Sequence, residues 1–284
     1  MAIHVNNTRL STGTQLRRWL IILSASALGL QGVGASMAQT TPVVNTRGPA
    51  VEEVTMSADA VIYQAVHSDE RLLRDVARDI DRHPQEVLHF FDVQPGQSVL
   101  DLFSGGGYYT ELLARVVGPS GHVIAHNNQA YLPFAKDDLA ERDYAHRLPS
   151  VELLIAEADE LTFEPAQFDR IFFILGFHDM FYAEDGWPAI NRTRLVAQLF
   201  QSLKPGGNVA IVDHDAAEGS DISTAHTLHR LASAHVIELM TQAGFVLAGR
   251  SHVLENEQDP LTISVFDKSI KGKTSRYVLK FEKP

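Results

Sequence analysis

The stretch from Ser98 to Val117 (SVLDLFSGGGYYTELLARVV) limits the possible folds more than any other part of this chain. Its first residues are apolar around a single acid, Asp101, which is typical of a buried strand. Three glycines follow, from Gly105 to Gly107, and apolar residues then recur at helical spacing. The stretch therefore predicts a strand, a tight turn and a helix, which together form the opening unit of an α/β fold.

Strand and helix patterns alternate along the rest of the chain. We predict strands at residues 98–103, 122–126, 151–156, 168–175, 208–213, 245–252 and 276–281, with helices at 108–117, 132–147, 192–203 and 232–243. This alternation indicates a mostly parallel sheet with helices on both faces, because each parallel pair needs a crossover connection. We therefore expect an α/β fold in one large domain.

The N-terminal region divides into parts by composition. Residues 1–38 carry three arginines and no acid, then an apolar run and small residues up to Ala38, as in a secretory signal peptide cleaved after Ala38. The apolar run is short for a membrane span, so we expect no stable membrane anchor after cleavage. Residues 39–56 are polar and broken by proline and glycine, which indicates a linker. Residues 57–284 form the predicted domain, and 57–95 form a helical cap at its start.

Charge and cysteine content exclude several classes of protein. The formal net charge is −11, and loss of the three arginines of the signal peptide takes it to about −14. Such an acidic chain is a poor partner for nucleic acid. The absence of cysteine excludes disulfides, thiolate zinc sites and cysteine nucleophiles, so any metal would need histidine and carboxylate ligands.

The glycine turn predicts a ligand site, since ligands of open parallel sheets bind beyond the carboxyl ends of the strands. Glycine allows close approach, and the free amides that open the following helix attract an anionic group. A dinucleotide fingerprint would need a third glycine where Tyr108, Tyr109 and Thr110 follow the turn, so a nicotinamide cofactor is disfavoured. The GKT at residues 272–274 lacks the first glycine of a P-loop, which argues against ATP chemistry there.

Four motifs, in order, resemble those of class I S-adenosylmethionine (SAM)-dependent methyltransferases. VLDLFSGGG resembles the family's first motif, VLDLGCGTG, with departures at Phe103 and Ser104. ELLIAEADELTFEPAQFDRIFF resembles the third and fourth strands, LKPGG the turn before the fifth, and AGF the turn before the sixth. The resemblance covers Gln85 to the C-terminus. It implies a Rossmann-like, seven-stranded class I methyltransferase fold, with SAM as the cofactor.

A narrower resemblance concerns the two ends of the chain. The export signal, GGGYYT and the ending KGKTSRYVLKFEKP are similar to those of a group of predicted, exported bacterial methyltransferases. This similarity implies export to the bacterial periplasm.

The resemblance also implies which residues contact the cofactor. Gly105 and Gly107 would let the backbone approach the methionine part, and Asp101 would order the turn or meet the amino group. Glu157 has the acidic position near the adenine. The expected cofactor residues are Asp101, Gly105, Gly107, Tyr108, Asn127, Glu157 and Ala158.

The end of the second strand departs from the family. An acid there binds both ribose hydroxyls in the family, whereas this chain has Asn127. An amide carries no charge, so the charge-assisted bonds to the ribose are lost. Asparagine is also a good turn residue, and a turn formed by Asn127 and Asn128 themselves is an equal alternative to ribose contact.

Histidines and carboxylates gather where the fourth and fifth strands are predicted to end. GFHDMFY and VDHDA bring to one sheet edge His178, Asp179, Asp213, His214 and Asp215. Histidine beside carboxylate suits a general base near neutral pH, and the candidate catalytic residues are His178, Asp179 and His214. The alternative is that His178 only packs below the cofactor and Asp213 only ends a strand.

A divalent ion is a further alternative for these residues. His226 and His229 lie three residues apart on a possible helix, a spacing that suits two ligands, and they could join the group above. Such pairs are more often ordinary surface residues, and we expect no metal.

Aromatic and basic residues suggest what the acceptor is. An aromatic-rich stretch surrounds the fourth strand, at Phe172, Phe173, Phe177, Phe181, Tyr182 and Trp187. We expect the first two in the core and the later ones near a small aromatic or apolar acceptor. The arginines at 71, 74, 78 and 82 predict a solvated face or partners for acids, and an anionic-acceptor site is the lesser alternative.

Three functions remain open on the sequence. The first is an exported SAM-dependent methyltransferase that acts on a small molecule. The second is a non-catalytic periplasmic binding protein that keeps the fold, and the third is a metal-dependent hydrolase or lyase. The sequence does not name the acceptor.

Overall fold

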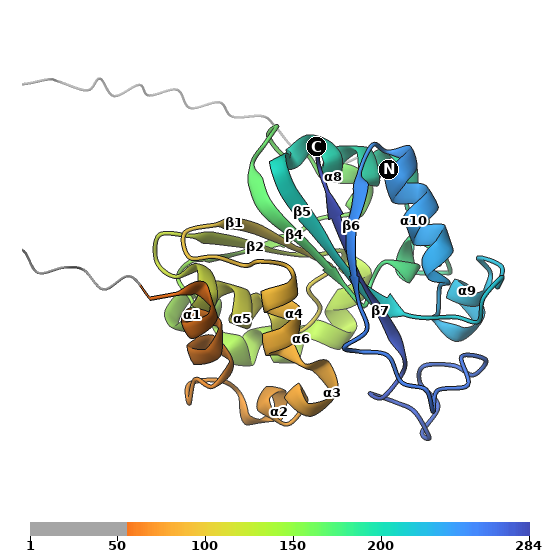
Figure 1. Ribbon diagram of the computed structural model, residues 1–284, viewed down its shortest axis with the longest axis horizontal. Coiled ribbons are helices and arrows are strands. Elements are labelled where there is room, and N and C mark those ends of the chain that lie inside the picture. Colours follow the sequence, from red (N-terminus) through yellow and green to blue (C-terminus); the bar gives the residue numbers. More distant parts are fainter. Residues whose placement is uncertain (1–55) are drawn as a thin grey trace, which may run out of the picture. The chain divides into compact units, whose positions relative to one another are not determined.

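A seven-stranded sheet runs through residues 56–284, the part of the chain that the computed structural model describes (Figure 1). Its strands are β1 (Ser98–Leu102), β2 (His122–Asn127), β3 (Val151–Ile155), β4 (Phe168–Ile174), β5 (Leu203–His214), β6 (Val246–Ser251) and β7 (Arg276–Glu282). The order across the sheet is β3-β2-β1-β4-β5-β7-β6, and only the two pairs made by β7 are antiparallel. The predicted seven-stranded, mostly parallel sheet is confirmed.

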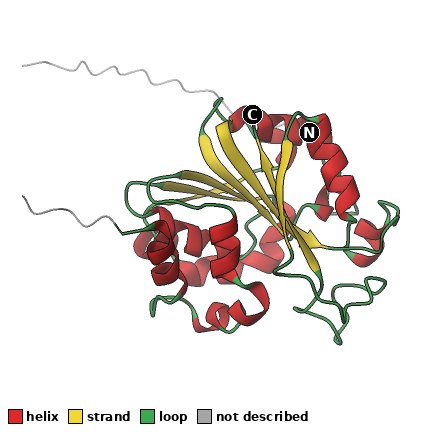
Figure 2. Ribbon diagram, in the orientation of Figure 1, coloured by secondary structure: helices red, strands yellow, loops and turns green. Residues whose placement is uncertain are grey.

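Helices cover both faces of this sheet (Figure 2). The α-helices are α1 (Ala58–Val66), α2 (Leu73–Val76), α3 (Asp79–Arg82), α4 (Pro84–Phe90), α5 (Tyr108–Val117), α6 (Leu132–Arg142), α7 (Tyr144–Arg147), α8 (Arg192–Ser202), α9 (Thr224–Leu228) and α10 (Ser233–Gln242). Short 3-10 helices are η1 (Gln129–Tyr131), η2 (Ala158–Glu160) and η3 (His178–Phe181). Apolar residues of α1, α4 and α5 form one core with the sheet, and those of α8 and α10 form the other.

The two cores explain why the sequences of the strands are continuous apolar runs. Successive side chains of a strand point to opposite faces, so a strand buried on both faces must be apolar at every position. Val99 of β1 packs into the α5 side, whereas Leu100 and Leu102 pack into the α8 side. Phe172 and Phe173 of β4 divide in the same way, and both are fully buried, as predicted.

Two predicted elements differ from the structure by more than one residue at an end. The single helix expected at 132–147 is interrupted at Asp143, whose φ of 44° is left-handed, and becomes α6 and α7. β5 begins at Leu203 rather than at Asn208, because Leu203 pairs with Phe168 before a bulge shifts the register. The LKPGG turn therefore lies within the extended strand.

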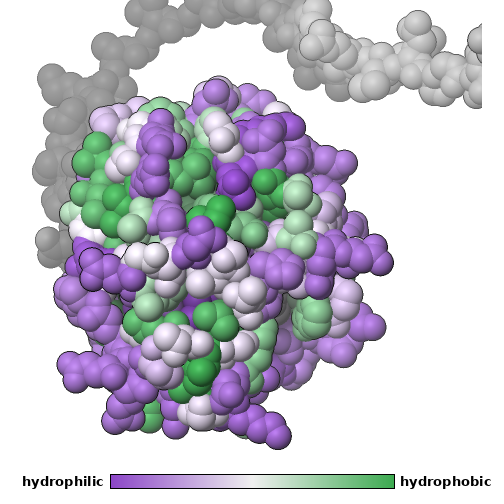
Figure 3. All heavy atoms as spheres, turned by 90° about the vertical axis from the view of Figure 1, so that its right-hand side faces the viewer, coloured by the Kyte–Doolittle hydropathy of each residue, from purple (hydrophilic) through white to green (hydrophobic). Residues whose placement is uncertain are grey.

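The order of the strands reverses between β1 and β4, and ligands of such sheets bind at this switch point. The face of the molecule that carries α9 and α10 is a mosaic of hydrophilic and hydrophobic residues (Figure 3). The predicted signal peptide and all of the linker except Met56 lie outside the described residues. Within residues 56–284, no helix is long and apolar enough to cross a membrane.

Candidate functional site

The glycine turn lies at the switch point of the sheet. After β1 ends at Leu102, Phe103, Gly105 and Gly107 have positive φ angles of 53°, 56° and 81°, and α5 begins at Tyr108. A bulky residue such as Phe103 rarely adopts this left-handed conformation, and such strain clusters at functional sites. Leu175, which follows β4 on the other side of the switch point, is strained in the same way, with a φ of 60°.

Asn127 fixes the shape of this turn. Its Oδ1 accepts a hydrogen bond from the amide of Gly105 at 2.8 Å. Its Nδ2 donates to the carbonyl of Gly105 at 3.0 Å and to Oγ of Ser104 at 3.1 Å. The amide of Asn127 is therefore engaged with the glycine turn, a role that the sequence did not predict, and Asn127 itself is the last residue of β2 rather than a turn residue. Its contact with a ribose stays a prediction.

A cavity opens beside the turn. The residues around it include Asp101, Phe103, Ser104, Gly105, Tyr108 and Leu175. A Cβ added at Gly105 would meet no atom within 4 Å, so this glycine leaves open space next to the cavity. Gly107 differs, because a Cβ there would lie 2.8 Å from Nε of Arg142. The lack of a side chain at Gly105 therefore leaves space beside the cavity open. The lack of a side chain at Gly107 instead allows Arg142 to pack against the turn.

Two buried polar groups at the end of β2 lack partners among the described residues. Asn128 is fully buried, and neither its Oδ1 nor its Nδ2 makes a hydrogen bond. Nδ1 of His126 also makes no hydrogen bond, while its Nε2 contacts the carbonyl of Ala156 at 3.0 Å. Buried polar atoms are nearly always hydrogen-bonded, so Asn128 is a candidate ligand contact. Asn128 is not among the residues predicted from the sequence, although it is the second of two consecutive asparagines.

Asp101 is buried at the end of β1 and accepts a hydrogen bond from Oγ1 of Thr110 at 2.5 Å. Burial raises the pKa of Asp101 to about 7, despite that hydrogen bond and the charge of Arg142. A positively charged group bound in the cavity would stabilise its ionised form. The geometry therefore suits the contact with an amino group that the resemblance implies.

The other expected cofactor residues also lie near the ends of the strands. Glu157 follows β3, and its Oε1 accepts a hydrogen bond from the amide of Gln129 at 3.3 Å, which joins the ends of β3 and β2. Ala158 is buried in η2 directly after it. Tyr108 lines the cavity, and its hydroxyl donates to Oδ1 of Asp79 at 2.5 Å.

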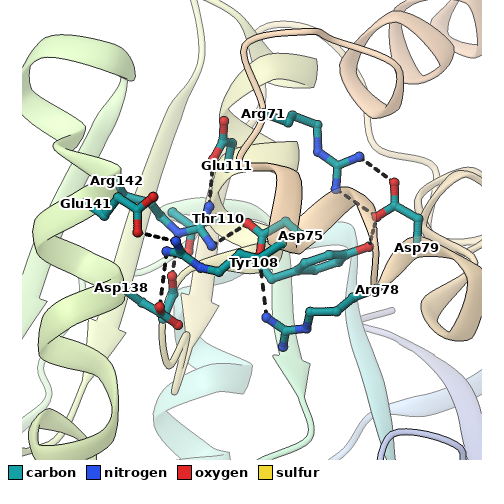
Figure 4. Close-up of polar contacts among 12 residues, drawn as sticks. Arg71, Asp75, Arg78, Asp79, Tyr108, Thr110, Glu111, Asp138, Glu141 and Arg142 are labelled. Carbon is teal, nitrogen blue, oxygen red and sulfur yellow. Dashed lines mark hydrogen bonds and ion pairs between the residues drawn. The ribbon is translucent and has the colours of Figure 1, made fainter.

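A network of charges ties the N-terminal cap to the glycine turn (Figure 4). Arg142 of α6 is fully buried and donates to Asp75 and Glu111 at 2.6 Å each. It also donates to the carbonyl of Gly106 in the turn. Arg71 makes a bidentate pair with Asp79 at 2.6 and 2.8 Å. Arg142 thus links the cap to the turn, by an ion pair with Asp75 and a hydrogen bond to Gly106.

The arginines of the cap do not all have the same role. Arg71 and Arg74 have carboxylate partners, which confirms the prediction that these arginines pair with acids. Arg78 keeps one longer contact of 3.4 Å with Asp75. Arg82 makes no ion pair with any described carboxylate, and its guanidinium lies 4.4 Å from the centre of the Tyr108 ring.

A hydrogen-bonded chain runs from the cavity into the sheet. Tyr131 lines the cavity, and its hydroxyl donates to Oδ2 of Asp179. Oδ1 of Asp179 lies 3.3 Å from Nε2 of His178, whose Nδ1 lies 2.9 Å from Oδ1 of Asp213. Asp213 also accepts hydrogen bonds from the backbone amides of His178 and His214, at 2.7 Å each. The structure thus brings together His178, Asp179 and Asp213 of the predicted group, and adds Tyr131. The ring centre of His214 lies 5.9 Å from that of His178, and Asp215 does not join this chain of contacts.

The two candidate histidines differ in charge. Burial lowers the pKa of His178, but the charges of Asp213 and Asp179 outweigh burial and raise it to about 9. Burial lowers the pKa of His214 to about 3, and its Nδ1 contacts Oγ1 of Thr274 at 2.7 Å. At neutral pH His178 is therefore an imidazolium between two carboxylates, which argues against its expected role as a free base. His214 is neutral.

This charge state gives a testable pH dependence. The folded-state pKa of His178 lies above its ordinary value of 6.5, so its stabilisation is fully present below pH 6.5 and is lost as the pH rises to about 9. We expect a loss of roughly 3 kcal/mol in the free energy of unfolding over this range, measured by urea denaturation. NMR titration of the His178 ring should give the same pKa.

Asp213→Asn isolates the cause of that shift. Without the carboxylate, burial dominates, and we expect the pKa of His178 to fall and the loss of stability between pH 6.5 and 9 to shrink. Asp143→Asn, beside the exposed His146, is the matched control and should leave the loss of stability between pH 6.5 and 9 nearly unchanged, because exposed ion pairs contribute little. A wild-type His178 that titrates below pH 7 would contradict the prediction.

The same region contains a geometry that could hold a metal ion. One ligand atom each from His178, Asp179 and His229 lies within 4.8 Å of the others. His229 caps α9 with a left-handed φ of 53°, and burial lowers its pKa to about 4, so its imidazole is neutral. His226, the predicted partner of His229, instead stacks on Tyr182 with ring centres 4.9 Å apart. The predicted i,i+3 pair is therefore not a ligand pair in the structure.

The fold is that of the class I SAM-dependent methyltransferases. The solved structure of a SAM-dependent methyltransferase from Aquifex aeolicus has the same fold, with a TM-score of 0.52 and 18% identity over 81% of this chain and 100% of that chain. The profile of the ubiE/COQ5 methyltransferase family matches residues 63–254, and the chain belongs to this family. Family and fold confirm the predicted enzyme class and imply SAM as its cofactor.

Curated relatives resemble part of the chain. The ubiquinone/menaquinone biosynthesis C-methyltransferase UbiE of Teredinibacter turnerae is 30% identical over 149 residues, 52% of this chain and 54% of that protein. UbiE of Ectopseudomonas mendocina is 30% identical over 122 residues, 43% of each protein. The chain spans about half the length of these curated relatives.

Proposed function

We propose that this chain transfers the methyl group of SAM to a small-molecule acceptor. The observation that carries the proposal is the cavity at the glycine turn, where Gly105 leaves open space and Asp101 ends β1 at the switch point of the sheet. Membership of the ubiE/COQ5 methyltransferase family supports the same reaction.

The chain offers a group for each part of the cofactor. The first amides of α5 have no partner within the helix and attract a carboxylate. Asp101 would hold the amino group, and the unpartnered amide of Asn128 is suited to hydroxyls of the ribose. Bound SAM would supply a methyl group on a positively charged sulfur. The buried polar atoms of Asn128 and the open space at Gly105 both fit such a ligand.

Methyl transfer is an in-line displacement, so positioning contributes most of the rate. The acceptor's nucleophile bonds to the methyl carbon while the carbon–sulfur bond breaks, and the electron pair of that bond stays on sulfur. A proton on the nucleophile must then leave. Tyr131 faces the cavity, and its hydroxyl can accept this proton as its own passes to Asp179. The His178 imidazolium would stabilise Asp179 before the transfer.

An aromatic acceptor is supported by the lining of the cavity. Phe103, Tyr108, Tyr109 and Tyr131 all contribute to it. Aromatic rings pack well against flat, partly apolar molecules. The names of the UbiE relatives refer to ubiquinone and menaquinone biosynthesis, which agrees with a ring-shaped acceptor.

Calorimetric titration of the full-length protein with SAM and S-adenosylhomocysteine tests the cofactor. We expect dissociation constants near micromolar, about −8 kcal/mol. Asp101→Asn should weaken the binding of SAM about tenfold, because it removes the charge that faces the amino group. Asp137→Asn, an exposed change of the same type on α6, should leave the affinity unchanged. A folded protein that binds neither compound would contradict the proposal.

The alternative of a non-catalytic binding protein predicts binding without turnover. The chain of Tyr131, Asp179 and His178 favours an enzyme, because it leads from the cavity to a group that can accept a proton. Formation of S-adenosylhomocysteine with an added acceptor would exclude the alternative. Export to the periplasm is a separate proposal that rests on residues 1–38 alone, and N-terminal sequencing of the protein from its native bacterium should find cleavage after Ala38.

A further inference from the structure

A second cavity lies beside the one at the glycine turn. The residues around it include Arg78, Asp81, Arg82, His214, Lys271 and Arg276. Arg78, Arg82 and Leu175 line both cavities, so the two are neighbours at the same edge of the sheet. The residues come from the N-terminal cap, from the end of β5 and from the segment that leads into β7.

The second cavity is strongly positive in a chain whose net charge is −11. Three arginines and Lys271 line it, against the single carboxylate of Asp81. His214 adds no positive charge, because burial lowers its pKa to about 3. Four cations against one acid leave an excess of positive charge around one small space.

Two of these arginines, the buried Arg276 and the partly buried Arg82, have no carboxylate partner among the described residues. Arg276 is only 6% exposed, and it donates to the backbone carbonyls of Thr274 at 3.1 Å and Asp81 at 2.6 Å. It makes no ion pair with a carboxylate in the part of the chain that the structure describes. Arg82 likewise packs on Tyr108 without one. A buried charge without a counter-charge is costly, and charged residues are rarely buried unless they are paired.

Two other arginines, Arg71 of the cap and Arg115 of α5, show what pairing does. Arg71, beside Asp79, and Arg115, beside Glu70 and Glu111, keep pKa values above the ordinary range although burial opposes this. Burial and the charge of Arg78 instead lower the pKa of Arg82 to about 10, and burial lowers that of Arg276. The second cavity therefore lacks the negative charge that carboxylates of the cap and of α5 supply to Arg71 and Arg115.

We propose that the second cavity binds a carboxylate or phosphate group of the methyl acceptor through Arg82, Arg276 and Lys271. Guanidinium groups bind both anions by paired hydrogen bonds, and Lys271 adds a flexible charge at the exposed side. The bound anion would direct the rest of the acceptor along Arg82 and Leu175 toward the glycine turn. This inference rests on the proposed function and adds an anionic group to the aromatic acceptor.

Titration with inorganic phosphate tests the subsite. The full-length protein is titrated by calorimetry, alone and with saturating S-adenosylhomocysteine. We expect phosphate to bind in both cases, with affinities that differ less than about twofold, because the two ligands occupy neighbouring cavities. Absence of phosphate binding would overturn the proposal. Competition by S-adenosylhomocysteine would also overturn it, since the arginines would then serve the cofactor's own carboxylate.

Matched variants locate the phosphate. Lys271→Glu and Arg82→Gln should each weaken phosphate binding about tenfold, because each removes one charged donor. Lys273→Glu makes the same charge change as Lys271→Glu, at an exposed residue of the same segment that does not line the cavity, and should change the affinity less than about twofold. Equal effects of the two lysine changes would overturn the proposal, because binding would then follow the overall charge.

The two proposals can fail separately. Phosphate binding with no binding of S-adenosylhomocysteine would refute methyl transfer and would leave an anion site. Binding of S-adenosylhomocysteine with no binding of phosphate would leave methyl transfer and refute the anionic subsite.

Discussion

Replacement of Arg142 by glutamine is expected to lower the free energy of unfolding by about 3 to 5 kcal/mol. Arg142 is fully buried, and its guanidinium donates to Asp75 and Glu111 at 2.6 Å each. Both carboxylates are themselves about 2% exposed or less. Glutamine would leave Asp75 with only the 3.4 Å contact to Arg78, so a buried charge would lose its partner.

Arg74→Gln is the matched control for this change. Arg74 belongs to the same network and pairs with Asp138 and Glu141, but about a third of its side chain is exposed, at 35%. Solvent-exposed ion pairs contribute little, and we expect a loss below about 1 kcal/mol. Urea denaturation of both variants at one pH measures the difference. Similar losses for Arg74→Gln and Arg142→Gln would mean that burial does not set the strength of this network.

The fold was predictable because its signals are local. The strand from 98 and the helix from Tyr108 to Val117 each show their own apolar period, and their bounds in the structure differ by one residue or none. The break at Asp143 was not visible, because α6 and α7 share a helical pattern and only the positive φ of Asp143 separates them. The early start of β5 depends on pairing with Phe168, which is a contact between distant residues.

The site was predictable only in part, for a similar reason. Strand ends meet at one edge of the sheet, so the meeting of His178 and Asp213 followed from the order of the strands. The charge of His178 did not, since it depends on two carboxylates and on burial at once. Arg276 was also missed, because its cavity is closed by the cap nearly two hundred residues earlier in the chain, through Asp81.

The departure from the family at Asn127 has a structural role at the glycine turn. A family acid at this position binds a ribose, and the sequence suggested that an amide would do this less well. In the structure the amide holds the glycine turn by three hydrogen bonds, with both donor and acceptor at suitable distances. A carboxylate could not donate to the carbonyl of Gly105, so the asparagine is suited to the turn.

Gly107→Ala is expected to cost at least about 3 kcal/mol of stability. The φ of Gly107 is 81°, where a side chain costs about 1 to 2 kcal/mol. Its Cβ would also lie 2.8 Å from Nε and 2.9 Å from Cδ of Arg142, and would contact the hydroxyl of Tyr144. Arg142 is held by two buried carboxylates and cannot move aside cheaply. Urea denaturation measures the loss, and a cost near 1 kcal/mol would show that the turn can shift.

Gly105→Ala is expected to lower ligand affinity more than it lowers stability, the reverse of Gly107→Ala. Its φ of 56° carries a similar backbone cost of about 1 to 2 kcal/mol, but its Cβ would meet no atom within 4 Å. The methyl group would instead enter the open space beside the cavity that Gly105 lines. We therefore expect a folded protein whose affinity for S-adenosylhomocysteine falls at least about tenfold, measured by calorimetry. Unchanged affinity in Gly105→Ala would mean that the cofactor does not approach the turn at this residue, and the role given to the cavity would have to be abandoned.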